Sequence, residues 1–347
     1  MLKADLLAPS ALGHAERAAW GAMLAASPPL QRAFLTPGFA LACEAAGFRV
    51  RVAVLHEAGR IRAFLPFQHK SAWHAALGLA ERVGGTMSDH AGLIAEDGVR
   101  IAPAELLRLC RLGGIYLSHL QEAQQGFGLT AERWRIGHRI DLDQGAAAYF
   151  EGLGAARRPF VNDTARRWRR AQAEFGELAF TATRRPAMAA VQAIIAEKRA
   201  QYRRTGAEDV LADGRRIALL RHLVERPAAD CEPFLGELRA GDRVLARHLG
   251  LLHAGVLSYW FPVYDPAAQK VSPGRLLLWQ TIREADALGI RMIDRGEGDS
   301  EAKRDFSSGT TQFGEAYYAA GTAWGGAARL LQAMEWRFGP RLGVAWS

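Results

Sequence analysis

The sequence predicts a mixed α/β fold that contains two similar halves, and three stretches of the chain support this. FRVRVAVLHEAGRIRAFLPFQHK, from residue 48, alternates apolar and polar residues around a Glu-Ala-Gly-Arg turn, which predicts a β-hairpin. EPFLGELRAGDRVLARHLGLLHAG, from residue 232, has the same pattern. Residues 255–294 then hold an aromatic strand, a helix and the short strand IRMID, a β-α-β unit whose two strands should lie parallel.

The order of these elements predicts five parts of the chain. We expect a helical segment at 1–35, a first half at 36–150, a helical connection at 151–229, a second half at 230–320 and a final helix at 321–347. Asn162, Asp163 and Thr164 offer N-cap residues for a helix through the arginines that follow. The two hairpins indicate an internal duplication, although any two hairpins share such a pattern.

Composition narrows the class of protein. The chain has 347 residues, of which 49% are hydrophobic and 23% charged, as in ordinary globular proteins. No apolar run is long enough to cross a bilayer and the N-terminus lacks the features of a signal peptide, so we expect a cytoplasmic protein. Cys43, Cys110 and Cys231 form no CxxC pair, so neither a disulfide framework nor a metal site is expected.

The net charge of +8 favours anionic partners. Arginines and lysines gather at 166–170 and 197–203, where a solvated helix face explains them as well as a binding surface does. Few aromatic residues beyond Trp168 alternate with these charges. We therefore expect no dedicated nucleic-acid surface.

The loop QKVSPG, residues 269–274, precedes the helix of the β-α-β unit. Its small residues let a ligand approach the backbone, and the N–H groups of the first helical turn suit an anion. Lys270 and Arg275 flank the loop and can neutralise phosphate charge. A plain turn in which a proline starts the helix would contain the same residues.

This loop also resembles the pyrophosphate loop Q-x-x-G-x-G of the GNAT acyltransferases, with Ser272 in place of the first glycine. The order hairpin, long strand, loop, helix and short strand is similar to the centre of that fold. Four stretches resemble the CelD/BcsL family of acetyltransferases of cellulose and exopolysaccharide production, which is related to the tandem-GNAT Fem-type transferases: SDHAGLI at 88–94, EKRAQYRRTGAED at 197–209, SPGRLLL at 272–278 and GIRMIDRGEGDSEAKRDF at 289–306.

The resemblance covers residues 36–320 and implies tandem GNAT-like domains, each a twisted mixed sheet flanked by helices. Two departures stand out. The turn after the last motif strand keeps its glycines but lacks the family's aromatic residue before Lys303, and Pro273 removes one N–H group from the anion cradle.

The resemblance implies that acyl-CoA is the co-substrate and that an extended pantetheine arm lies between the strands at 255–264 and 290–295. The donor-binding residues would be Gln269, Lys270, Ser272, Gly274, Arg275 and Leu276. The thioester would lie near Tyr259, Trp260 and Tyr264.

Three side chains are candidates for the chemistry. Asp294 is the first candidate for the base, Tyr264 for the acid that protonates the thiolate, and His248 for a second base. Each has a structural alternative: Asp294 would cap the RGEG turn, Tyr264 would pack against the sheet, and a lone histidine on a strand is more often structural.

Three further residues are candidates for acceptor binding. Lys303 would bind an acidic acceptor or stay solvated, and Asp89 and His90 would shape the acceptor groove of the first half or cap their loop.

The sequence therefore predicts an acyl-CoA-dependent N- or O-acyltransferase, with a saccharide or lipid-linked saccharide as the acceptor. The basic surface and the final helix, with Trp336 and Trp346, offer a route to peripheral association with the inner membrane. Two alternatives stay open: a Fem-type transferase of peptidoglycan that uses aminoacyl-tRNA, and a non-catalytic GNAT-like regulator of polysaccharide synthesis.

Overall fold

The computed structural model describes residues 2–321, and these form two compact units. Unit 1 comprises residues 2–135 and 312–321, and unit 2 comprises residues 136–311. The chain therefore leaves unit 1 within one strand, β7 (Arg133–Asp141), and returns to it within another, β13 (Gly309–Ala319). The helix predicted at 321–347, with Trp336 and Trp346, lies outside the described residues.

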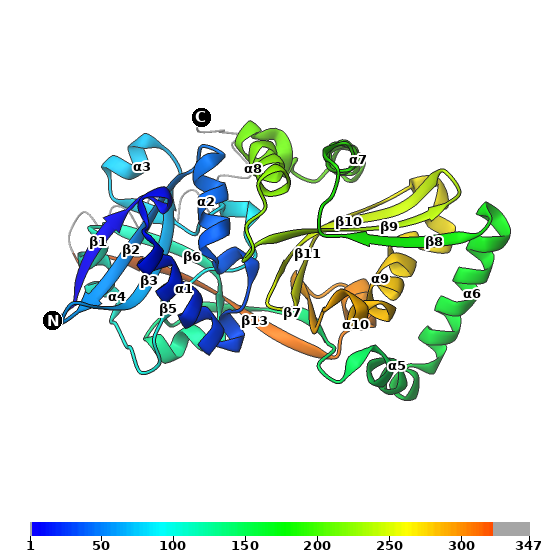
Figure 1. Ribbon diagram of the computed structural model, residues 1–347, viewed down its shortest axis with the longest axis horizontal. Helices are drawn as coiled ribbons and strands as arrows, with labels where there is room; N and C mark the ends of the chain where they lie inside the picture. Colours follow the sequence, from blue (N-terminus) through cyan, green and yellow to red (C-terminus); the bar gives the residue numbers. More distant parts are fainter. Residues whose placement is uncertain (1, 322–347) are drawn as a thin grey trace. The chain divides into compact units, whose positions relative to one another are not determined.

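Unit 1 begins with a strand and two helices and then forms most of its sheet (Figure 1). Its helices are α1 (His14–Ala26), α2 (Pro37–Ala45), α3 (Ala72–Ala76) and α4 (Pro103–Cys110). Its strands, besides the parts of β7 and β13, are β1 (Lys3–Leu7), β2 (Arg49–Glu57), β3 (Arg60–His69), β4 (Leu79–Glu81), β5 (Ile94–Ala95) and β6 (Gly114–Gln121). Short 3-10 helices cover Pro9–Ala11, Pro28–Leu30, Ala33–Leu35, Gly85–Met87 and Glu122–Phe127.

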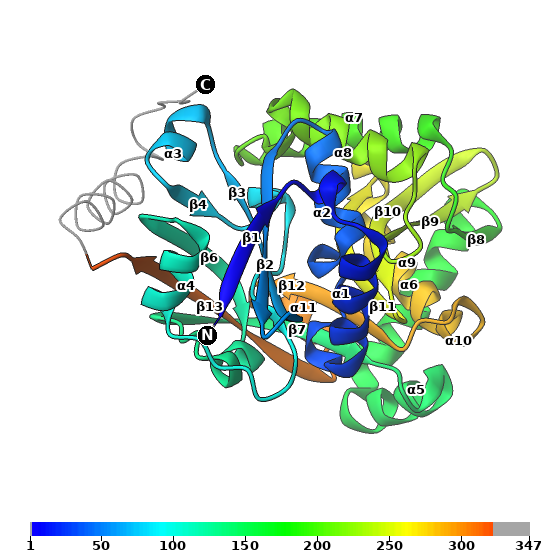
Figure 2. The same ribbon diagram turned by 60° about the vertical axis from the view of Figure 1, so that its left-hand side comes forward.

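The strands of unit 1 follow the order β1-β2-β3-β4-β6-β13, with β5 paired to β3. Helices α1 and α2 cover one face (Figure 2). There Trp20 stacks on Phe64, with ring centroids 5.0 Å apart. Helix α4 supplies Leu106 and Leu107 to the core on the other face, which also contains Leu117. Because both faces are covered, β2 and β3 are buried over most of their length.

Two short strands of unit 1 were not predicted. Residues 3–7 form β1, an antiparallel partner of β2, where the sequence predicted a helix. The pairing partner is distant in sequence, so local periodicity does not reveal it. The three-residue strand β4 was likewise too short to stand out, although it pairs in parallel with β6. The hairpin β2–β3 is confirmed, and Ala58 and Gly59 form its turn with positive φ.

Unit 2 holds the second hairpin and the β-α-β unit. Its helices are α5 (Gly145–Ala156), α6 (Arg158–Phe175), α7 (Met188–Thr205), α8 (Gly214–Glu225), α9 (Pro273–Arg283), α10 (Ala285–Leu288) and α11 (Glu301–Asp305). Its strands, besides the parts of β7 and β13, are β8 (Leu178–Thr183), β9 (Glu232–Ala240), β10 (Arg243–His253), β11 (Val256–Tyr264) and β12 (Met292–Glu297). Short 3-10 helices cover Val210–Ala212 and Pro266–Val271.

The strands of unit 2 follow the order β7-β12-β11-β10-β9-β8. Figure 1 shows α7 above these strands and α9 and α10 below them. Leucines at 276, 277 and 278 of α9 are buried against strand residues such as Leu238 and Leu257. The predicted hairpin β9–β10 and the parallel pairing of β11 with β12 are both confirmed.

One predicted helix start is wrong. Asn162, Asp163 and Thr164 lie inside α6, which begins at Arg158. Thr164 Oγ1 donates to the carbonyl of Phe160 one turn earlier, and Asp163 pairs with arginines instead of capping the helix. Residues with good N-cap chemistry therefore serve here in ion pairs and in a hydrogen bond along the helix.

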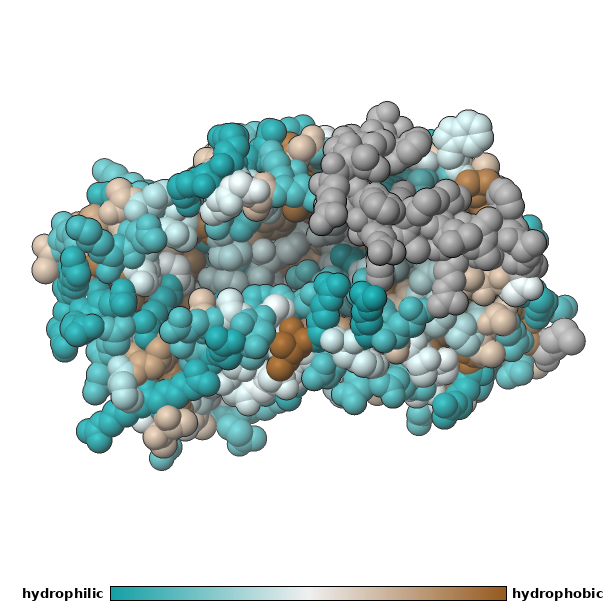
Figure 3. Space-filling view, turned by 180° about the vertical axis from the view of Figure 1, so that it is seen from behind, coloured by the Kyte–Doolittle hydropathy of each residue, from teal (hydrophilic) through white to brown (hydrophobic). Residues whose placement is uncertain are grey.

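The surface is mostly hydrophilic on the face shown in Figure 3, where apolar residues form only scattered spots. None of the helices within residues 2–321 combines the length and the apolar character that crossing a bilayer requires.

Candidate active site

The parallel strands β11 and β12 pair over only three residues. Val256, Leu257 and Ser258 pair with Met292, Ile293 and Asp294, and the two strands share no further pairs. Strand β11 then continues to Tyr264 along β10, while β12 pairs with β7. The two strands therefore part beyond Ser258 and Asp294.

A cavity of about 450 Å³ opens where β11 and β12 part. Strand β11 supplies Tyr259, Pro262 and Tyr264, and β12 supplies Arg295. The remaining lining residues come from α7, the 269–278 segment and the 301–306 segment: Gln201, Gln269, Ser272, Pro273, Gly274, Arg275, Leu278, Glu301, Ala302, Asp305 and Phe306. The N-terminus of α9 thus borders the cavity.

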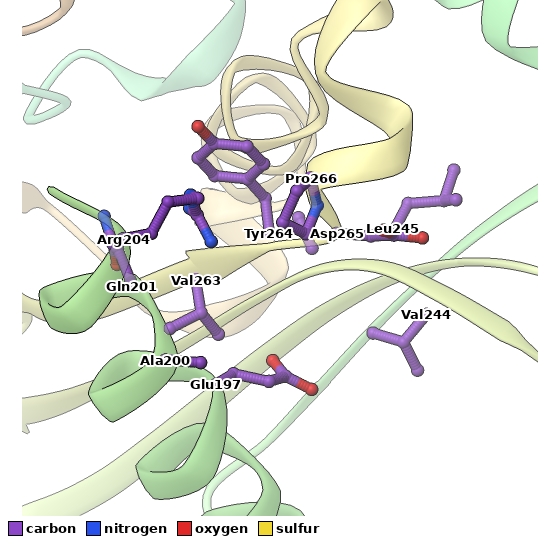
Figure 4. Close-up of a pocket in the computed structure, with 11 residues that line it drawn as sticks. Glu197, Ala200, Gln201, Arg204, Val244, Leu245, Val263, Tyr264, Asp265 and Pro266 are labelled. Atoms are coloured by element: carbon purple, nitrogen blue, oxygen red, sulfur yellow. The ribbon is translucent and has the colours of Figure 1, made fainter.

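A smaller cavity of about 250 Å³ lies next to it and shares Gln201 and Tyr264 with it. Figure 4 shows side chains of α7 on one side of this cavity and the end of β11 on the other. Glu197 lies on this α7 face, where burial raises the pKa of its carboxyl group although Arg247 contacts it at 2.9 Å. The two cavities therefore lie next to each other along α7.

The loop before α9 has the backbone conformation of a glycine turn. Ser272 adopts φ 53° and ψ 60°, the left-handed region in which the resembling motif has glycine. Its Oγ accepts a hydrogen bond of 2.9 Å from Arg167 of α6. Beyond it, Gly274 has no atom within 4 Å of the position that a Cβ would occupy. The loop therefore leaves open space at the first turn of α9.

Of the two cationic residues at this loop, Arg275 has protein partners. Arg275 donates to Asp163 at 2.9 Å and to the carbonyl of Phe160 at 3.1 Å, and it lies over the Phe160 ring. This arginine joins α9 to α6, and it shares the Asp163 carboxylate with Arg166 and Arg167. Lys270 is exposed and is not among the cavity-lining residues. The Leu276 side chain is buried in the core.

A β-bulge lies in β11 beside the cavity. Pairing with β10 stops at Leu249–Phe261 and resumes at Leu251–Ser258, so Tyr259 and Trp260 lie opposite the single residue Gly250. A Cβ at Gly250 would come within 2.5 Å of the Ser258 carbonyl, which explains the glycine.

His248 fills this bulge. Its Nε2 accepts the Trp260 N–H at 3.1 Å, and its ring stacks on Tyr259 with centroids 3.7 Å apart. Burial holds the pKa of His248 well below its usual value, so the imidazole is neutral. The side chain is wholly buried, and the arrangement is the structural alternative that the sequence offered. Burial also raises the pKa of Tyr259 to about 12.

Asp294 and Lys303 hold the C-terminal end of β12, where its pairing with β7 is irregular. Asp294 is 3% exposed, and its Oδ1 accepts the N–H of Gly296 at 2.9 Å. Lys303 Nζ lies 2.5 Å from the Glu297 carbonyl oxygen and 3.4 Å from that of Gly296. Neither side chain is among the cavity-lining residues. Asp294 therefore has the turn-capping position that the sequence gave as an alternative to a base.

Asp305 is a titratable group that sequence reasoning missed. It ends α11 and lines the cavity, and burial raises the pKa of its carboxyl group against the opposing effect of Arg275. A raised pKa makes a carboxylate a better proton acceptor near neutral pH. It belongs to the EAKRDF stretch that the sequence singled out, so its position in the motif was visible but its orientation was not.

The two predicted residues of the first half lie in unit 1. His90 is buried, with its Nδ1 3.0 Å from Gln121 Nε2 and its ring near those of Phe34 and Phe313. Asp89 is partly exposed on the same loop. Across residues 2–321, no cluster of three His, Cys, Asp or Glu side chains is arranged to hold a metal ion.

Comparison with protein families gives one match. Residues 158–304, all within unit 2, match a family model described as the acetyltransferase (GNAT) domain. This part of the chain is similar to GNAT acetyltransferase domains. The match includes the β-α-β unit, the loop before α9 and the bulge in β11. Comparison with curated protein sequences found no significant match.

Solved structures are similar in fold to most of the chain. The crystal structure of FemX has a TM-score of 0.59 at 11% identity, with 95% of this chain and 100% of that chain covered. A protein of unknown function from Bacteroides thetaiotaomicron scores 0.52 at 11% identity, covering 92% and 100%. The C-terminal domain of a putative lysylphosphatidylglycerol synthetase from Agrobacterium fabrum scores 0.50 at 10% identity, covering 93% and 97%. At such identities the likeness concerns the fold, and the predicted fold class is confirmed.

Proposed function

We propose that this protein transfers an acyl group from acyl-CoA to an amine or hydroxyl group of a sugar or polysaccharide precursor. The observation that carries this proposal is the early end of the β11–β12 pairing, which leaves a cavity bordered by the N-terminus of α9. An extended donor fits such a gap, because unpaired strand edges offer backbone hydrogen bonds. The open space at Gly274 admits a diphosphate close to the helix N-terminus.

The cavity contains groups suited to direct transfer. The acceptor's nitrogen or oxygen attacks the thioester carbonyl carbon, a new bond forms there, and the carbon–sulfur bond breaks. Asp305 takes the proton that the nucleophile loses, and Tyr264 donates a proton to the leaving thiolate. The solvent then returns Tyr264 and Asp305 to their starting protonation states.

The base assignment has a direct test in two matched variants. We expect Asp305→Asn to lower kcat/KM roughly 10²- to 10⁴-fold, because general base catalysis contributes about that much. Asp294→Asn retains an oxygen acceptor for the Gly296 N–H and should change the rate little. The reverse pattern in steady-state kinetics would return the role of base to Asp294.

Donor binding can be tested at Gly274. We expect acetyl-CoA or octanoyl-CoA to bind the wild-type protein and Gly274→Ala in calorimetric titration, and Gly274→Trp to abolish binding. The indole would project into open space, so the fold should persist in an unchanged circular dichroism spectrum. Failure of both thioesters to bind the wild-type protein would rule out an acyl-CoA donor.

One observation favours the second candidate, a transferase that takes its acyl group from aminoacyl-tRNA. Arg275 is already paired with Asp163, and Pro273 lacks an N–H, so the loop offers fewer free groups to a diphosphate. Retained turnover with aminoacyl-tRNA and none with acyl-CoA would decide for this candidate. Binding without any turnover would favour a regulator.

A further inference from the structure

Arg295 lines the cavity and carries a positive charge that no ion pair within residues 2–321 neutralises. It follows Asp294 on β12, and its guanidinium lies over the Tyr259 ring, 5.1 Å from the centroid. Its Nη1 is shielded from solvent and has no hydrogen-bond partner. Within residues 2–321, no carboxylate forms an ion pair with it.

The other arginine of the cavity shows the contrast. Arg275 has a carboxylate, a carbonyl and an aromatic ring as partners, although its Nε lacks one, whereas no hydrogen bond or ion pair joins Arg295 to another of the described residues. Burial lowers the pKa of Arg295, which reflects the cost of its charge in this environment. The side chain of Gln201 lines the same cavity, and its buried Oε1 also lacks a hydrogen-bond partner.

Two explanations account for a guanidinium whose Nη1 is shielded from solvent and has no partner among the described residues. In the first, Arg295 is structural and stabilises the fold through its contact with Tyr259, a contribution of modest size. In the second, its missing partner is a ligand, because an anion entering the cavity would form charge-assisted hydrogen bonds with a donor that is already in place. The second explanation also covers Gln201, because its Oε1 accepts no hydrogen bond from any residue between 2 and 321 and a ligand could donate one.

We propose that Arg295 binds an anionic group, a carboxylate or a phosphate, on the acceptor. This rests on the proposed function for the cavity as a transfer site. Gln201 Oε1 would accept a hydrogen bond from a hydroxyl or amine of the same molecule. The carboxylates of Glu301 and Asp305 also line the cavity, which disfavours an anion beside them and favours the acceptor's amine there. The acceptor class is therefore an amino sugar or a related amine that carries an acidic group.

Three amino sugars that differ only at C6 test the proposal: glucosamine, glucosamine 6-phosphate and 2-amino-2-deoxyglucuronic acid. We expect one or both charged sugars to bind the wild-type protein at least tenfold more tightly than glucosamine in calorimetric titration. Arg295→Gln should erase this preference and Arg295→Lys should keep part of it. Arg283→Gln removes an exposed positive charge of α9 and should change nothing. The two charged sugars separate a carboxylate from a phosphate.

Absence of the preference in the wild-type protein, or its survival in Arg295→Gln, would overturn the proposal. Arg295→Gln should also leave acetyl-CoA binding unchanged, and weaker donor binding with unaltered sugar binding would assign the residue to the donor. If the charged sugars bind more tightly than glucosamine but acetyl-CoA does not bind, the proposed acyl-CoA donor would be wrong. The proposal that Arg295 binds the anionic group of the acceptor would still hold.

Thermal melting of the ligand-free protein separates the two explanations independently. A structural arginine should lower the melting temperature when it is replaced. Because an unpaired buried charge is costly, we expect Arg295→Met to melt at the same temperature as the wild-type protein or higher. A clear fall in melting temperature would favour the structural explanation and count against the proposal.

Discussion

Units 1 and 2 each contain a pair of parallel strands joined through a helix, but the space beyond the pair is used differently. In unit 1, β4 ends with its third pairing residue, and the chain turns back so that Ala91 bridges to Leu120 of β6. In unit 2, β11 continues for six residues beyond Ser258 without pairing to β12. Unit 1 therefore fills the gap with its own loop, and unit 2 leaves a cavity.

The filling of unit 1 depends on one amide side chain. Gln124 is wholly buried, and its amide accepts the N–H of Leu93 at 2.8 Å and donates to the carbonyl of Leu93 at 3.0 Å. The lesson is that the same order of elements gives a closed or an open site according to the length of one strand and the path of one loop.

The largest expected difference between the two units is in the free energy of unfolding when alanine replaces Gly92 in unit 1 or Gly274 in unit 2. A Cβ at Gly92, where φ is 150°, would lie 2.3 Å from Gln124 Cδ, whereas a Cβ at Gly274 meets nothing. We expect Gly92→Ala to lower the free energy of unfolding by roughly 3 kcal/mol, because the buried amide must move. Gly274→Ala should change it by less than about 0.5 kcal/mol. Urea unfolding measures the stability of both variants. Similar losses of stability would show that the two loops are equally open, which would contradict the difference between the two units.

An effect of intermediate size is expected in unit 2, where protein stability should depend on pH through Lys198. Lys198 donates to the Pro262 carbonyl at 3.2 Å, and burial lowers its pKa to about 8. Between pH 8 and 10.5 the unfolded chain holds a proton that the folded protein releases, so stability should rise with pH across this window.

We expect Lys198→Met to remove this rise, which should amount to roughly 1–3 kcal/mol in urea unfolding at pH 7.5 and pH 10. Lys270→Met, a change at an exposed lysine of the same unit, should retain it. Equal pH profiles for the wild-type protein and Lys198→Met would show that Lys198 titrates normally.

The smallest expected effect is the difference in stability between two substitutions of Ser272. Both Ser272→Gly and Ser272→Ala lose the hydrogen bond from Arg167, but only glycine relieves the left-handed backbone at φ 53°. We expect the glycine variant to be about 0.5–1 kcal/mol more stable than the alanine variant in urea unfolding. Equal stability would mean that the loop relaxes away from this conformation in solution.

The sequence was sufficient to predict the elements that depend on the local pattern of apolar, polar and small residues. The aromatic run Val256–Tyr264, the small residues before α9 and the short strand at 290–294 were sufficient to predict the β-α-β unit and its parallel pairing. The loop before α9 and Tyr264 line the cavity, and their roles in binding and catalysis stay predictions.

The cavity's charged residues depend on long-range register, which local pattern does not contain. Arg295 faces Tyr259 only because Ser258 pairs with Asp294. Arg275, by contrast, has the spacing of a phosphate ligand but meets Asp163 on a helix 112 residues earlier. The sequence therefore identifies charged residues near the loop before α9, but it does not show which of them bind a ligand and which form ion pairs within the fold.

The division of the chain into units also has a consequence for synthesis. Unit 2 is continuous in sequence, whereas unit 1 is completed only when β13 pairs with β6, where Tyr116 Oη donates to Glu315 at 2.5 Å across 199 residues. A chain emerging from the ribosome can finish unit 2 first, although unit 1 is made first. The early residues must wait for that closing strand, and the folded unit 2 shortens the loop that remains to be closed.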